Sequence, residues 1–155
     1  MTQRWRTEAT GDEGFTLIEL MVVVLIIGIL IAIALPTFLG ARTRAQNRAA
    51  QSDLRNALVA AKTIYTDNSS YAGATSGAVA GVEPSLTFVT GAATGTQVGV
   101  AAISATQWAA ARLSASGVCF YISDSSTVGT RYGQTASGTA CVTPTMALAA
   151  NTTWS

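Results

Sequence analysis

One carboxylate lies inside a long apolar segment near the N-terminus of this 155-residue chain. From Phe15 to Leu35 there are 21 residues, and Glu19 is the only charged one. A helix of about 20 apolar residues crosses the roughly 30 Å hydrocarbon core of a bilayer. A charged side chain in such a helix is costly and usually marks a functional site with a partner. Glu19 is therefore the first candidate functional residue; the alternative is a carboxylate tolerated at the membrane interface.

The two cysteines of the chain, Cys119 and Cys141, both lie far downstream of the apolar segment. Such a pair suggests a disulfide formed in an oxidising compartment. The bridge would close a loop of 23 residues, counted inclusively, and stabilise the fold by about 3 kcal/mol in the chain-entropy model. The alternative is a free thiol or a redox centre. The sequence favours the disulfide because it contains no Cys-x-x-Cys motif and no histidine.

The composition excludes several classes of chemistry. The absence of histidine removes His-based acid–base catalysis and the commonest metal ligand. A net charge of +1, with 11% charged residues, implies no strongly charged partner. The chain has no phosphate-binding loop, dinucleotide fingerprint or zinc-ligand spacing. We therefore expect no enzyme activity, no cofactor, no metal and no specific nucleic-acid partner.

The apolar segment is predicted to continue as an amphipathic helix. Beyond Leu35, an apolar stripe recurs at three- and four-residue spacing, formed by Phe38, Ala41, Ala45, Ala49, Leu54, Leu58, Ala61 and Tyr65. Turn-forming residues at Asp67–Ser70 end the pattern. A helix over 15–66 is about 75 Å long at 1.5 Å per residue, so lipid covers only its first half, 15–35. The second half, 36–66, must pack on the C-terminal part of the chain.

The C-terminal part is predicted to form a small antiparallel sheet. A loop over 67–96, with one short β-like run, leads to a domain at 97–155. In that domain, short runs separated by Ser, Gly or Asp suggest a meander, at Gln97–Ile103, Trp108–Ser114, Val118–Ser123 and Val128–Tyr132. Ser116–Gly117 is predicted to form a hairpin turn. For 104–115 a helix is the alternative, because Ser104 to Gln107 resembles a capping box ahead of Ala-rich sequence. The predicted fold class is α+β, a long N-terminal helix packed on this sheet.

The segment Gly14-Phe15-Thr16-Leu17-Ile18-Glu19-Leu20, the aliphatic run after it and Ala34-Leu35-Pro36 together resemble the N-terminus of type IV pilins and related pseudopilins. The resemblance extends to about Tyr65. It implies that residues 1–14 are a leader, that a prepilin peptidase cleaves between Gly14 and Phe15, and that Phe15 is then N-methylated. It also implies that Glu19 neutralises the N-terminal amine of a neighbouring subunit during filament assembly.

The resemblance also implies a function. The chain is expected to be a structural subunit that is held in the cell membrane as a single-pass protein before assembly. It then polymerises through its apolar helix, as many copies, into an extracellular type IV pilus. Membrane lipid, the prepilin peptidase and the inner-membrane assembly machinery are the other expected partners. Alternatives are a minor pilin, a pseudopilin of a type II secretion or competence system, or a membrane-tethered binding domain.

Two further expectations concern the helix. Gly28, Pro36 and Gly40 weaken it and predict a kink, and the resemblance implies that this stretch can lose helicity in a fibre. Basic side chains that follow the apolar segment are expected to form ion pairs between subunits, namely Arg42, Arg44, Arg48 and Arg55.

Overall fold

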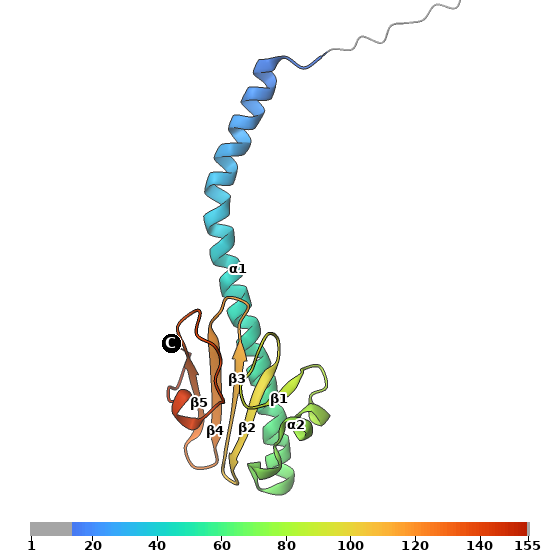
Figure 1. Cartoon of the computed structure of the whole chain (residues 1–155), viewed down its shortest axis with the longest axis vertical. Coiled ribbons are helices and arrows are strands. Elements are labelled where there is room, and N and C mark those ends of the chain that lie inside the picture. Colours follow the sequence, from blue (N-terminus) through green and yellow to red (C-terminus); the bar gives the residue numbers. More distant parts are fainter. Residues whose placement is uncertain (1–13, 155) are drawn as a thin grey trace, which may run out of the picture. The chain divides into compact units, whose positions relative to one another are not determined.

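The computed structural model describes residues 14–154, which form one long helix followed by a five-stranded sheet (Figure 1). Helix α1 spans Leu17–Asn68, a 3₁₀ turn follows at Tyr71–Gly73, and helix α2 spans Ser76–Val82. The strands are β1 (Phe88–Thr90), β2 (Val98–Ser104), β3 (Gln107–Leu113), β4 (Cys119–Ser125) and β5 (Gly129–Gln134), and a second 3₁₀ turn covers Met146–Leu148. The chain divides into two units within α1: the first ends at Leu39 and the second, the C-terminal unit, begins at Gly40. Of the expected leader, 1–13 lie outside the described residues.

The second half of α1 packs on the sheet, as predicted, through small and aliphatic side chains. They recur at three- and four-residue spacing and are at most 8% exposed: Ala50, Leu54, Ala57, Leu58, Ala60, Ala61 and Ile64. The predicted stripe was correct at Leu54, Leu58 and Ala61 and wrong N-terminal to them. Phe38, Ala41, Ala45 and Ala49 are exposed, because the packed face of α1 begins only at Ala50.

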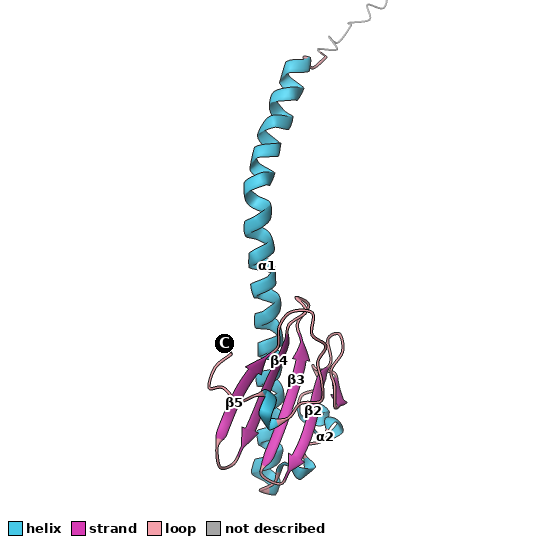
Figure 2. Cartoon of the chain, turned by 60° about the vertical axis from the view of Figure 1, so that its left-hand side comes forward, coloured by secondary structure: helices cyan, strands magenta, loops and turns pink. Residues whose placement is uncertain are grey.

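The sheet has the strand order β1-β2-β3-β4-β5 (Figure 2). Strands β2 to β5 form the predicted antiparallel meander, and β1 adds to it in parallel beside β2. The alternative helix at 104–115 is wrong, since β3 pairs along its whole length with β4. Ala109, Ala110 and Ala111 are at most 1% exposed. Packing on both faces therefore decides the strand against the helix propensity of alanine.

Each face of the sheet has its own apolar cluster. Toward α1, the side chains of Val98, Val100, Trp108, Phe120 and Ile122 join the main core. The opposite face carries a smaller cluster, formed by Ala93, Ala111, Cys119, Tyr121, Cys141 and Ala149. Because both faces are covered, every residue of β4 is buried.

The segment 67–96 was predicted as a connecting loop with one short β-like run; β1 confirms the run, and α2 was not predicted. The Thr75 hydroxyl accepts a hydrogen bond from the Ala78 N–H (3.4 Å) and caps α2. Val79 is fully buried and attaches α2 to the core. The helical signal of this segment is weak because a seven-residue helix rich in Gly and Ala has little apolar periodicity. Position 99 requires glycine, because a Cβ there would collide with the Gly91 carbonyl as the chain passes from β1 to β2.

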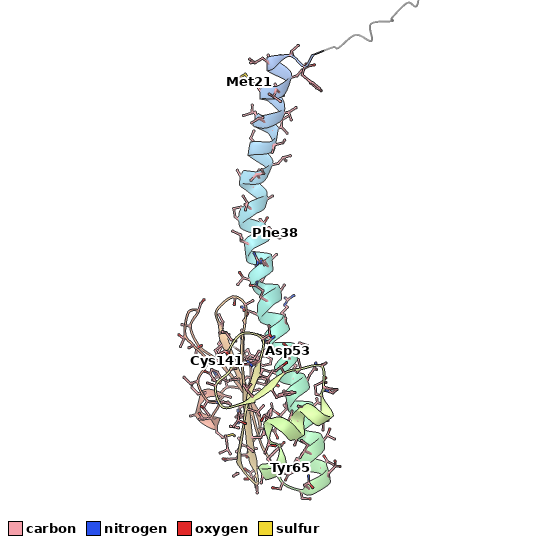
Figure 3. The ribbon with its side chains drawn as sticks, turned by 45° about the vertical axis from the view of Figure 1, so that its right-hand side comes forward. Met21, Phe38, Asp53, Tyr65 and Cys141 are labelled. Atoms are coloured by element: carbon pink, nitrogen blue, oxygen red, sulfur yellow. A yellow bond between two sulfur atoms is a disulfide. The ribbon has the colours of Figure 1, made fainter. Side chains whose placement is uncertain are left out.

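Cys119 and Cys141 form a disulfide, with their Cα atoms 5.4 Å apart (Figure 3). The predicted turn is also present: the Gly117 N–H donates to the Ser114 carbonyl (2.9 Å), and Gly117 has a φ of 86°. The bridge holds the segment after β5 against the outer face of the sheet.

Two ion pairs join α1 to the sheet. Arg112 on β3 donates to Asp53 Oδ2 through Nε (2.8 Å) and Nη2 (2.6 Å). On β4, the buried Asp124 receives Lys62 Nζ at 3.0 Å. Asp124 also accepts hydrogen bonds from the Tyr71 hydroxyl and the Thr130 hydroxyl, each at 2.6 Å. A buried carboxylate needs such partners.

Removing the disulfide should destabilise the chain. Replacing both cysteines with alanine is expected to lower the free energy of unfolding by about 3 kcal/mol, because the unfolded chain regains the entropy of the open loop. The measurement is denaturant unfolding of the full chain in detergent, followed by tryptophan fluorescence. Reduced wild-type protein is the control and should match the variant; equal stability of oxidised wild type and variant would contradict the prediction.

Tyr71 should make the fold sensitive to alkaline pH. Burial of its ring, and next the Asp124 carboxylate beside its hydroxyl, raise the pKa of Tyr71 well above its usual value near 10. Above pH 10 the unfolded chain therefore binds fewer protons than the folded chain, so stability falls as pH rises. Tyr71→Phe should show a shallower fall between pH 9 and 11 in the same unfolding assay. Since the other tyrosines are common to both proteins, identical pH slopes would refute this role.

Candidate processing and assembly site

The residues around the expected cleavage point precede α1 and lead directly into its first turn. Gly14, Phe15 and Thr16 are not helical, and Phe15 is 90% exposed. Thr16 is the N-cap: its hydroxyl accepts from the Glu19 N–H (3.3 Å), and its own N–H donates to Glu19 Oε2 (2.8 Å). This reciprocal pair is a capping box. The Gly14–Phe15 peptide bond is thus exposed just outside a capped helix.

Of the two oxygens of the Glu19 carboxylate, one accepts hydrogen bonds from the described residues and the other accepts none. Oε2 accepts both the Thr16 N–H and the Thr16 hydroxyl, the latter at 2.7 Å. Within residues 14–154, no basic side chain forms an ion pair with Glu19. A negative charge in the first turn is favoured by the helix dipole. The site is therefore a fixed anion with room for one further donor.

Glu19 lies near the start of a long apolar segment whose side chains are exposed. Its large side chains are 47–90% exposed, from Phe15 to Leu39. Met21 and Phe38 project from the helix in Figure 3. By length and composition, α1 is apolar enough to cross a membrane: its most apolar 18-residue window has a mean hydropathy of 3.1 and is 0% buried. An apolar surface of this extent needs a lipid or protein partner.

Helix α1 runs through all three of the residues predicted to weaken it, Gly28, Pro36 and Gly40. Pro36 has no N–H to donate to the preceding turn. The neighbouring Thr37 hydroxyl donates to the Ala34 carbonyl (2.8 Å). This is not the carbonyl that the missing N–H of Pro36 would have bonded. The kink and the loss of helicity stay predictions.

Sequence reasoning missed several contacts. Thr16 was not singled out, although the Thr-x-x-Glu spacing ahead of an apolar run is itself a capping-box signal. Arg55, expected to pair between subunits, lies over the Trp154 ring of the same chain, 4.7 Å from its centroid. The Asp124 cluster joins residues far apart in sequence, and no local pattern could reveal it.

With this geometry in place, comparison with known proteins gives the class of the N-terminal segment. Residues 10–35 match the family model described as the prokaryotic N-terminal methylation motif. The match includes the Gly14–Phe15 bond, Glu19 and the whole apolar segment from Phe15 to Leu35. No solved structure matches the chain.

Two relatives extend the match beyond the motif. The type IV major pilin protein PilA of Myxococcus xanthus is 43% identical over 60 residues, which is 39% of this chain and 27% of that protein. The type IV wide pilus major component PilA4 of Thermus thermophilus is 42% identical over 59 residues, 38% of this chain and 45% of that protein. The chain thus spans less than half the length of these relatives. Over that stretch, the comparisons confirm the resemblance to type IV pilins.

The capping box predicts a local effect of Thr16. Thr16→Val removes the hydroxyl that accepts from the Glu19 N–H and should weaken the first turn by about 1 kcal/mol. In detergent micelles, hydrogen exchange of the Glu19 amide should become about fivefold faster, the factor that corresponds to this energy. Thr16→Ser keeps a hydroxyl and is the matched control. Unchanged exchange in the valine variant would show that the hydroxyl does not cap α1.

Proposed function

We propose that this chain is the structural subunit of an extracellular type IV pilus and polymerises through its apolar N-terminal helix. The observation that carries the proposal is the combination at one helix end of an exposed cleavable bond, a fixed anion and a long uncovered apolar surface. The matched motif and the names of both relatives, a major pilin and a major pilus component, support it.

Processing creates the group that the anion lacks. A prepilin peptidase would cleave between Gly14 and Phe15, and Phe15 would then carry a positive, N-methylated amine. That amine and Glu19 lie about one helical turn apart, so the amine of one subunit can reach the Glu19 carboxylate of another at a similar depth. In a low dielectric, opposite charges attract strongly and each is costly alone. Glu19 would therefore set the register in which subunits join.

The apolar surface would serve two environments in succession. Before assembly, residues 15–35 would span the cell membrane once, with lipid around them. The inner-membrane assembly machinery would then move the subunit into the fibre, where the same side chains pack on those of neighbouring subunits. In such a fibre, Gly28, Pro36 and Gly40 would mark the stretch of helix that yields under tension.

The role would be structural rather than enzymatic, and the chain would be a main subunit. The presence of Glu19 and the names of the relatives favour this over a minor pilin or a pseudopilin of a secretion or competence system. A membrane-tethered binding domain would need the same anchor but no fibre.

The direct experiment is electron microscopy of material sheared from cells, with mass spectrometry of its main protein band. We expect fibres made chiefly of this chain, beginning at a methylated Phe15. Membrane-bound protein without fibres would indicate a tethered domain, and fibres in which this chain is scarce would indicate a minor subunit.

Charge at position 19 should be essential for assembly but not for insertion. Glu19→Ala should leave the protein in the membrane fraction and abolish or severely reduce sheared fibres, because the amine of the next subunit has no counter-ion. Glu19→Gln is the informative second variant, since its amide oxygen can still accept from the Thr16 N–H while the charge is gone. Fibres at the wild-type level from Glu19→Gln would show that capping, rather than charge, is the role of this residue.

A further inference from the structure

The exposed side of α1 in the C-terminal unit separates its charges by sign. Arg48, Arg55 and Lys62 are seven residues apart, so they lie along one flank of the helix at two-turn intervals. Arg44 lies one turn before Arg48 on this flank. Lys62 reaches Asp124 on β4 and the Thr130 hydroxyl on β5 (3.2 Å). The basic flank therefore faces the β5 side of the unit.

The flank that faces α2 (Figure 1) carries one carboxylate at a groove, that of Glu83 at the C-terminal end of α2. Here Asn56, Val59 and Ala60 of α1 line a groove of about 170 Å³ together with Val82 and Glu83. Two apolar side chains in it are open to solvent: Val59 is 65% exposed and Val82 44% exposed. Ligand pockets for small molecules are usually about 300–1,000 Å³. This groove instead fits one long side chain.

The charges nearest these two surfaces have no partner of opposite sign in the described part of the chain. Its ion pairs are Lys62–Asp124 and Arg112–Asp53. Arg44 and Arg48 are exposed and belong to neither. Glu83 uses Oε1 to accept from the N–H (3.3 Å) and hydroxyl of Ser85. Both flanks thus present charges for an external partner.

We propose that the groove beside Glu83 receives Arg48, supported by Arg44, from a second copy of this chain. The aliphatic stem of an arginine would cover Val59 and Val82, and its guanidinium would donate to Glu83. The signs of the two flanks are complementary, so a second copy is the occupant that the charges select. The inference rests on the proposed function, since it needs copies held side by side.

The geometry of the pair also selects an open assembly. Glu83 lies beside Asn56 to Ala60, which follow Arg48 by eight to twelve residues, or about 12–18 Å along the helix axis. Copies anchored in one membrane have parallel helices. A two-fold axis along those helices gives no axial offset, so it cannot bring Arg48 to Glu83. The contact therefore requires a staggered, heterologous arrangement, which is the kind that builds filaments.

Charge reversal with rescue tests the pairing in the full chain. Glu83→Lys, and separately Arg44→Glu with Arg48→Glu, should each lower the sheared-fibre fraction at least about tenfold. Combining all three changes should restore fibres to near the wild-type level. Asp67→Lys is the matched control for the acidic side, because Asp67 is exposed on α1 but does not line the groove. Failure of the Glu83 rescue, or equal rescue by Asp67→Lys, would overturn the proposal.

Photo-crosslinking gives a second readout that does not depend on the yield of variants. A benzoylphenylalanine placed at Val59 should cross-link, in wild-type fibres, to a peptide of another copy that contains residues 44–48. The same probe at Val128, which is 59% exposed between β4 and β5, should not. Fibres without the cross-link from position 59 contradict the pairing alone. Absence of fibres from the unmodified chain contradicts the proposed function, and the pairing falls with it.

Discussion

The large apolar side chains between Phe15 and Phe38 are exposed in the described part of the chain, and water is a poor environment for them. Burying one Leu, Ile or Val side chain contributes about 1.5–3 kcal/mol, and this segment consists mostly of such residues. That gain is non-directional. The hydrophobic effect favours moving the segment from water into lipid or against other helices, but it does not determine the angle, the depth or the partner. In the proposed fibre, polar groups at or beyond the ends of the segment would therefore supply much of the specificity of assembly.

The C-terminal unit fixes which polar groups remain available. Arg112–Asp53 and Lys62–Asp124 hold α1 against β3 and β4, so the rotation of the helix about its axis is defined in this unit. No buried side-chain nitrogen or oxygen in residues 14–154 is left without a hydrogen bond. The charges of Asp53, Lys62, Arg112 and Asp124 are thus paired within the unit, while Arg48 is exposed and Glu83 lies half-buried at the groove beside α1. The charges left at the surface of the unit are therefore those that its internal ion pairs do not use.

The predictability of each part depended on the range of the interaction behind it. Local periodicity was enough for α1, for β2 to β5 and for the turn at Gly117, and two cysteines left only one intramolecular pairing. Periodicity failed where packing partners decide, as at Ala49, which is exposed beside the buried Ala50. It failed also at α2, which depends on the burial of Val79 rather than on propensity. The Asp124 cluster could not be predicted from local patterns because its members are up to 62 residues apart, from Lys62 to Asp124.

The two proposed polar contacts would constrain a fibre in different ways. In the proposed fibre, an ion pair at Glu19 would fix depth within the apolar segment, but one contact would leave neighbouring copies free to rotate about it. A second contact in the C-terminal unit, with an axial offset of about 12–18 Å rather than about one helical turn, would add a further constraint on how the copies are arranged. If the stretch around Pro36 yields, the apolar segment and the C-terminal unit can move apart while each keeps its own contact. Two anchoring contacts joined by a compliant helix would let a fibre lengthen without separating its subunits.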